Sequence, residues 1–197
     1  DTNASTAERP VTVKVQEFGN KTQSAGATAT YTPSSAQAEY FRIWSCDVNG
    51  NTVAGNAFAV LNWRLYTGGG QSGTKLPPDL TSATSATDIV ISAGHTYTPS
   101  GTAYADYKAF TSDTLSSWWW SLGNGDVAKQ WLQIQFEDGT YDTKPVIRSM
   151  EIRFYQAYGP EYFKLTSSAN ADHSSATTHA IFSTGDDHGT NNTITYG

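Results

Sequence analysis

Charged residues are scarce in this sequence, at 15% of the 197 positions. The twelve Lys and Arg are scattered along the chain, and the formal net charge is −6. A protein that binds nucleic acid needs a stripe of basic side chains to contact the phosphates. Because the sequence has no such stripe, we expect no nucleic acid among its partners.

Cysteine and long apolar segments are scarce as well. Because Cys46 is the single cysteine, an intrachain disulfide is excluded, and its place in an apolar stretch predicts a buried, unreactive thiol. Nothing in the sequence approaches the run of about 18 apolar residues that a membrane-spanning helix needs. We therefore expect no membrane insertion.

Aromatic residues, in contrast, reach 13%, and apolar residues recur in short alternating segments. This usage is typical of strands, and no stretch shows a sustained helical periodicity. We therefore predict an all-β fold, an antiparallel β-sandwich or jelly roll. The predicted strands are Glu39–Cys46, Phe58–Tyr66, Asp88–Ile91, Trp131–Phe136, Val146–Phe154, Tyr162–Thr166 and Thr178–Ser183.

Composition divides the chain into an N-terminal arm and a body. Residues 1–38 are rich in Thr, Ala and Ser and contain one alternating segment, Val11–Val15, which predicts an extended arm with one strand. The predicted sandwich, 39–197, consists of 39–67 with the first strands, 68–79 as a flexible Gly- and Pro-rich connection, and 80–197 as the main part.

The order of five short motifs in the second half of the chain resembles a known family. The motifs are Ala109–Ser112, Ser116–Ser121, Trp131–Phe136, Val146–Ile152 and Pro160–Leu165. In this order they resemble the discoidin-like domain, also called the coagulation factor V/VIII type C domain, which has a galactose-binding-like fold. Upstream, Tyr40–Ile43 and Trp63–Leu65 resemble the first strands of such domains in phage tail-fibre and capsid-decorating proteins. The resemblance implies a jelly roll, usually non-catalytic, that binds glycans, lipid head groups or protein surfaces through loops at one end.

Three consecutive tryptophans, Trp118, Trp119 and Trp120, are the most unusual local feature. Because alternate residues of a strand face opposite sides, the three cannot all be core residues. An exposed indole can stack on a sugar ring or anchor a protein interface, whereas coverage by the arm would make the triplet structural. The resemblance adds four tyrosines in loops at the ligand end, for which ordinary loop packing is the alternative: Tyr104, Tyr107, Tyr155 and Tyr158.

Acidic and histidine residues offer two further kinds of site. Family members that bind a structural calcium ion use a carboxylate in a turn where this chain departs from the pattern and has Thr111. Asp113, two residues further on, is the candidate Ca²⁺ ligand that would substitute for it. Other candidates for metal binding or catalysis are Asp172, His173, His179, 186–188, Glu137, Asp138 and Asp142. Their spacing matches neither a zinc site nor a pair of catalytic carboxylates, and polar turns account for them. We expect no enzymatic activity.

Together these features predict a non-enzymatic virion surface protein, either a phage fibre or a capsid-decorating subunit. Its sandwich would bind a glycan or another host-surface molecule, and its arm would contact other virion subunits in an oligomeric assembly. The expected location is the virion surface or the extracellular space. Two alternatives fit the same residues: a secreted carbohydrate-binding module, and a purely structural capsid cement protein whose aromatic residues make subunit contacts.

Overall fold

A computed structural model describes the chain in segments. The described residues are 11–15, 18–22, 30–34, 36–53, 58–68, 72–86, 88–97, 105–112, 119–121, 129–137, 144–154, 160 and 162–183. Strands dominate them: β1 (Val11–Val15), β2 (Phe18–Thr22), β3 (Thr30–Ser34), β4 (Ala36–Gln37), β5 (Tyr40–Cys46), β6 (Ala59–Tyr66), β7 (Lys75–Leu76), β8 (Ile89–Ala93), β9 (Trp119–Trp120), β10 (Trp131–Phe136), β11 (Val146–Ile147), β12 (Ser149–Phe154), β13 (Tyr162–Ser168) and β14 (Thr177–Ser183). A short 3₁₀ helix, η2 (Asp106–Phe110), precedes β9. In these ranges we find no helix of the length and hydropathy needed to cross a membrane.

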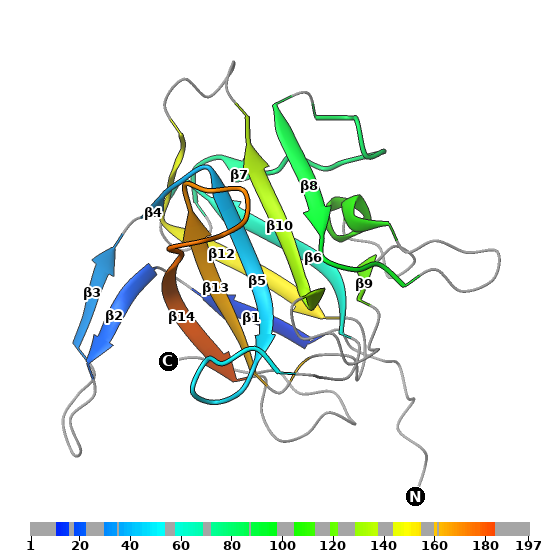
Figure 1. The fold of residues 1–197 in the computed structure, drawn as a ribbon. Helices are drawn as coiled ribbons and strands as arrows, with labels where there is room; N and C mark the ends of the chain where they lie inside the picture. The colour runs from blue at the N-terminus through cyan, green and yellow to red at the C-terminus, as the bar shows by residue number, and fades with distance from the viewer. Residues whose placement is uncertain are drawn as a thin grey trace, which may run out of the picture.

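Two antiparallel sheets pack against each other (Figure 1). One, called the β5 sheet here, has the strand order β14-β13-β5-β10-β8. The other, the β6 sheet, has the order β1-β12-β6-β7, with β9 also paired with β6. The predicted class, an all-β antiparallel sandwich, is confirmed. The strand segments predicted beyond residue 38 correspond to β5, β6, β8, β10, β11 with β12, β13 and β14.

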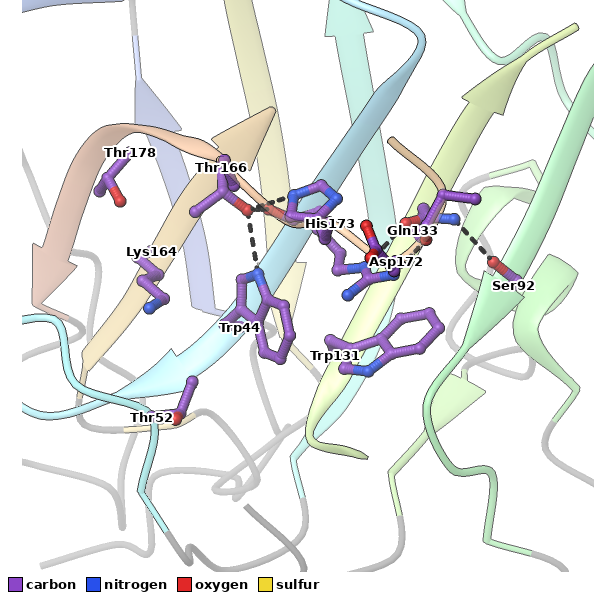
Figure 2. A pocket seen from close by; sticks show the side chains of 13 residues that line it. Trp44, Thr52, Ser92, Trp131, Gln133, Lys164, Thr166, Asp172, His173 and Thr178 are labelled. Atoms are coloured by element: carbon purple, nitrogen blue, oxygen red, sulfur yellow. Dashed lines mark hydrogen bonds between the residues drawn. The ribbon is translucent and has the colours of Figure 1, made fainter. Parts of the chain in front are cut away.

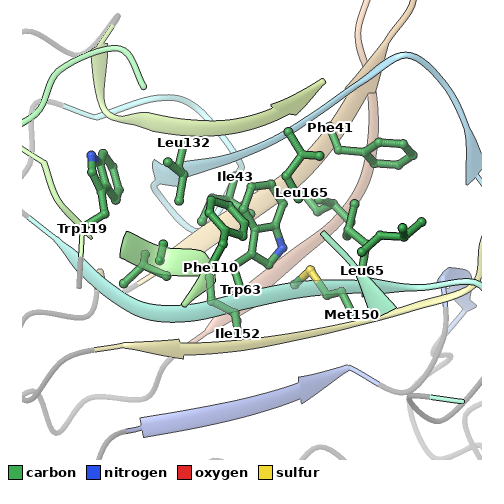
Figure 3. Close-up of a cluster of buried hydrophobic side chains, with 14 of the residues drawn as sticks. Phe41, Ile43, Trp63, Leu65, Phe110, Trp119, Leu132, Met150, Ile152 and Leu165 are labelled. Carbon is green, nitrogen blue, oxygen red and sulfur yellow. The ribbon is translucent and has the colours of Figure 1, made fainter. Parts of the chain in front are cut away.

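Alternation along the strands places the core between the two sheets (Figure 3). Phe41 and Ile43 of β5 and Leu132 of β10 are fully buried on one side of it, and Trp63 and Ile152 of the β6 sheet are fully buried on the other. Burial of a side chain of this size contributes about 1.5–3 kcal/mol. Because inward and outward positions alternate, the neighbours of these residues form the outer faces of the sheets.

The segment 68–79, predicted as a flexible connection, joins strands of the same two sheets. β6 precedes it, and β12, which pairs with β6 along most of its length, follows it. Within the segment, β7 pairs with β6, and Leu76 is buried. The sandwich is therefore built from the chain on both sides of this segment.

The N-terminal region contributes strands to the fold. The alternating segment Val11–Val15 is β1, which pairs antiparallel with β12 and forms an edge of the β6 sheet. β2 and β3 form an antiparallel pair, and β4 pairs with β11. The alternation of residues predicts one strand in this region. The other strands depend on pairing with a partner segment, which local alternation does not reveal.

Candidate binding site on the outer face of the β5 sheet

The outer face of the β5 sheet carries a groove of about 810 Å³. Side chains of β5, β8, β10, β13 and β14 line it, together with the loop 169–176 that joins β13 to β14 (Figure 2). The groove is thus built from strands that are far apart in the sequence.

Strand register assembles two rows of side chains on this face. The first row consists of Lys164, Trp44 and Trp131, from β13, β5 and β10. The second row consists of Thr166, Arg42 and Gln133, from the same three strands. Because residues two apart on a strand share a face, both rows project outward, away from the core.

Two indoles of the first row form an aromatic surface, the Trp44–Trp131 platform. Their ring centroids are 6.2 Å apart with planes inclined at 56°, and both side chains are partly exposed. The indole Nε1 of Trp44 donates a hydrogen bond of 2.9 Å to Thr166 Oγ1, which holds the ring in place. Glycine is needed at Gly94, because a Cβ there would lie 2.5 Å from Trp131 Nε1. Indoles held in this way are suited to stacking on the apolar faces of sugar rings.

Arg42, in the second row, packs its guanidinium against both indoles of the platform. It is 5% exposed, and its guanidinium carbon lies 3.8 Å from the ring centroid of Trp131 and 5.0 Å from that of Trp44. Nε donates to Gln133 Oε1 at 2.7 Å, and Nη2 donates to the carbonyl of Ala171 at 3.2 Å. Burial lowers the pKa of Arg42 to about 10, so the group stays charged at neutral pH.

The loop 169–176 forms one side of the groove. Its Asp172 Oδ1 accepts a hydrogen bond of 2.9 Å from the backbone nitrogen of Ser174. Between them His173 adopts the left-handed conformation, with φ of 61°. The His173 ring lies on the sheet with Nε2 2.8 Å from Thr166 Oγ1, and its Nδ1 has no hydrogen-bond partner among the described residues. The ring is therefore held in a neutral, largely buried position.

Burial of His173 affects its ionisation. Its pKa falls from 6.5 to about 4, first because burial disfavours the imidazolium and then because the charges of Arg42 and Lys164 oppose it, while Asp172 acts in the opposite direction. The unfolded chain therefore takes up a proton at higher pH than the folded chain does.

Above pH 6.5, the ordinary pKa of histidine, we expect His173 to leave the free energy of unfolding unchanged. As the pH falls from 6.5 to about 4, the free energy of unfolding should decrease, because the unfolded chain binds a proton that the folded chain does not. The loss should be about 1–3 kcal/mol, since the open groove screens part of the effect. Asn tolerates left-handed backbone, so His173→Asn is the test variant. Urea unfolding at several pH values between about 7 and 4 should show a smaller loss in the variant. An equal loss in both proteins would contradict the burial of a neutral ring.

The sequence-predicted tryptophans divide between core and surface. Trp119 is fully buried: its ring centroid lies 5.1 Å from that of Phe58, edge to face, and its Nε1 donates to Thr96 Oγ1 at 3.1 Å. The ring therefore has no exposed face to offer a ligand. Trp120, the next residue of β9, is partly exposed, and its ring centroid lies 5.2 Å from that of Tyr97.

Of the predicted tyrosines and the third tryptophan, the structure describes the position of Tyr107 alone. Tyr107 in η2 is partly buried and packs against the core. Trp118, Tyr104, Tyr155, Tyr158 and the proposed calcium ligand Asp113 lie outside the described residues. Of the predicted ligand-binding residues that the structure describes, none lines the groove.

The turn in which the resemblance implies a calcium site is bound by a buried arginine. Arg64 is 2% exposed. Its guanidinium donates to the carbonyl groups of Ala109 at 3.2 Å and Thr111 at 2.7 Å, and to Asp79 Oδ1 at 2.9 Å. Backbone carbonyls of this kind are typical Ca²⁺ ligands. At this turn, both carbonyl groups already accept hydrogen bonds from the positively charged guanidinium of Arg64 in β6.

Within the described part of the chain, no three His, Cys, Asp or Glu side chains gather where they could hold a metal ion. His173 and His179 each lie beside a hydroxyl group instead, that of Thr166 at 2.8 Å and that of Ser167 at 2.7 Å. Cys46 is buried as predicted, and burial raises the pKa of its thiol to about 11. The residues Asp138, Asp142 and 186–188 lie outside the described ranges.

Sequence reasoning missed the groove although a signal was present. In β5 the apolar Phe41 and Ile43 alternate with Arg42 and Trp44, and this alternation predicts that the second pair faces outward. Trp131 alternates with buried residues of β10 in the same way. Such a pattern identifies outward residues, but it does not indicate which of them meet.

Comparison with known proteins gives no match to a protein-family model, to a curated protein or to a solved structure. The antiparallel β-sandwich is therefore established by the structure, whereas the discoidin-like identity has its support in the sequence motifs alone.

Proposed function

We propose that this chain is a non-enzymatic β-sandwich that binds saccharides on the Trp44–Trp131 platform. The observation that carries the proposal is the pair of partly exposed indoles, 6.2 Å apart, on the outer face of the β5 sheet. Flat apolar surface suits the C–H faces of a sugar ring, and a few polar groups beside it orient the ligand.

Hydrogen-bonding groups surround the platform. Gln133 Nε2 donates to Ser92 Oγ at 3.2 Å, and both side chains line the groove. Thr52 and Thr178 line it as well. Hydroxyl and amide groups both donate and accept hydrogen bonds, as do the hydroxyl groups of a sugar.

The acidic groups of the groove support binding rather than hydrolysis. Among the described residues that line it, Asp172 is the one carboxylate. Hydrolysis of a glycosidic bond ordinarily needs two carboxyl groups on opposite sides of that bond. Asp172 is also engaged by the backbone of its own loop, through Ser174.

The setting that we propose is a virion or other extracellular surface, on which a phage fibre or capsid-decorating subunit contacts host glycans. The support for this setting is in the sequence: the order of the motifs that resemble the discoidin-like domain, and the Thr-, Ala- and Ser-rich N-terminal region. A secreted carbohydrate-binding module is the alternative that would use the same groove.

Binding to a glycan array, followed by calorimetric titration of a bound glycan, tests the proposal. We expect Trp44→Ala and Trp131→Ala each to weaken binding by roughly fivefold or more, because a central aromatic contact contributes on the order of 1–3 kcal/mol. Far-UV circular dichroism should show that both variants remain folded.

Trp120→Ala is the matched control, because Trp120 is also partly exposed but lies on the β6 sheet. We expect it to bind glycans like the unmodified protein. Loss of binding in Trp120→Ala, with normal binding in the two platform variants, would place the ligand at the tryptophan triplet. Failure of the unmodified protein to bind any glycan would refute the proposal.

A further inference from the structure

The groove holds two cations that form no ion pair with a carboxylate of the described residues. Lys164 Nζ donates to the carbonyl of Gly50 at 2.8 Å. Arg42 donates to the side-chain amide of Gln133 and to the carbonyl of Ala171. All of these acceptors are uncharged. The groove is therefore a positive site on a chain whose formal net charge is −6.

Compensation by an opposite charge is incomplete at Arg42, which is 5% exposed and donates no hydrogen bond to a carboxylate of the described residues. Removing a charge from water is costly, and buried charges are ordinarily paired with an opposite charge. Stacking of the guanidinium on the face of Trp131, at 3.8 Å, offsets part of the cost. Asp172 lines the same groove, and its charge raises the pKa of Arg42, but burial has the larger effect and the net result is a lowered pKa. A bound anion would supply the remaining compensation.

Both cations lie beside the same indole. Lys164 Nζ is 5.7 Å from the ring centroid of Trp44, and the Arg42 guanidinium carbon is 5.0 Å from it. Their charges also act together on His173, whose pKa both of them lower. Lys164 is partly exposed, and its ammonium group has three N–H donors, of which the bond to Gly50 uses one. A sugar stacked on Trp44 would therefore present its substituents to Lys164.

We propose that the saccharide bound on the platform is anionic and carries a carboxylate or sulfate group that binds Lys164 in the field of Arg42. This inference rests on the proposed function, since it specifies the ligand of the same groove. A hydrogen bond from an ammonium group to an oxyanion is shorter and stronger than one between neutral groups. The anionic substituent thus provides the selectivity, and the platform provides the stacking surface.

Matched monosaccharides test the inference. D-Glucose, D-glucuronate and D-glucose 6-sulfate share one ring and differ in the exocyclic group, and the galactose series offers the same comparison. Proton–nitrogen correlation spectra report binding through the indole signals of Trp44 and Trp131, and the buried Trp63 and Trp119 serve as internal references. We expect the anionic sugars to bind at least about fivefold more tightly than the neutral sugar at low salt, with a smaller advantage at high salt. The relative affinities for D-glucuronate and D-glucose 6-sulfate show whether the site prefers a carboxylate or a sulfate group.

Variants of Lys164 complete the test. Lys164→Gln should reduce the preference for anionic sugars by about fivefold, with a smaller effect on neutral sugars, whereas Lys164→Arg should retain the preference. Lys75→Gln is the matched control, because Lys75 lies on β7 of the β6 sheet. Equal affinity for neutral and anionic sugars would overturn the inference and leave the proposed function standing. The absence of indole shifts with every sugar would overturn the proposed function itself.

Discussion

Replacement of Arg64 by methionine is expected to lower the free energy of unfolding by about 3 kcal/mol, because buried groups lose their charged donor. The guanidinium connects β6 to the carbonyl groups of Ala109 and Thr111 and to Asp79. Methionine keeps an apolar stem of similar length but donates no hydrogen bond. The turn after η2 and the segment that contains Asp79 would therefore both lose their hydrogen bonds to this side chain.

The variant Lys75→Met is the matched control, because Lys75 Nζ binds the same oxygen of Asp79 at 2.8 Å. The two side chains of this pair are 41% and 46% exposed, and an exposed ion pair contributes less than about 1 kcal/mol. Urea unfolding followed by tryptophan fluorescence measures both variants. If the two substitutions reduced stability equally, Arg64 would not be the main connection between β6 and the turn.

Replacement of Trp119 by alanine is expected to reduce the free energy of unfolding by about 3–5 kcal/mol, the range for removing a large aromatic side chain from a core. Trp119 is fully buried, packs edge to face with Phe58 and donates a hydrogen bond to Thr96. Alanine would leave a cavity and an unpaired threonine hydroxyl. Since domains are stable by only about 5–15 kcal/mol, the loss is a large share of the total.

The neighbouring Trp120→Ala is the matched control, with an expected loss of about 1 kcal/mol, because Trp120 is partly exposed and its ring packs on Tyr97. Trp119→Phe, which retains much of the aromatic packing, keeps the comparison measurable if the alanine variant does not fold. Chemical unfolding of all three gives the order of the losses. A larger loss in Trp120→Ala than in Trp119→Ala would mean that β9 presents its other face to the core.

The short strands show where prediction from sequence fails. β7 and β9 contain two residues each and form antiparallel pairs with the long strand β6. A two-residue segment is too short to show alternation, so its state depends on the partner strand beside it. For the same reason, the tryptophan triplet predicts that Trp119 faces away from its neighbours, but it does not indicate which side is the core.

The sequence by itself determined the strand segments of the body and the all-β antiparallel class, because alternation of apolar and polar residues is a local property. The same alternation indicates that Arg42 and Trp44 face outward from the sheet. Only the tertiary structure decided which outward residues meet. Trp44 and Thr166 are 122 positions apart and Arg42 and Gln133 are 91 apart, and the register of β13, β5 and β10 brings them into one groove. That register depends on burying the apolar faces of all strands at once, so no local pattern encodes it.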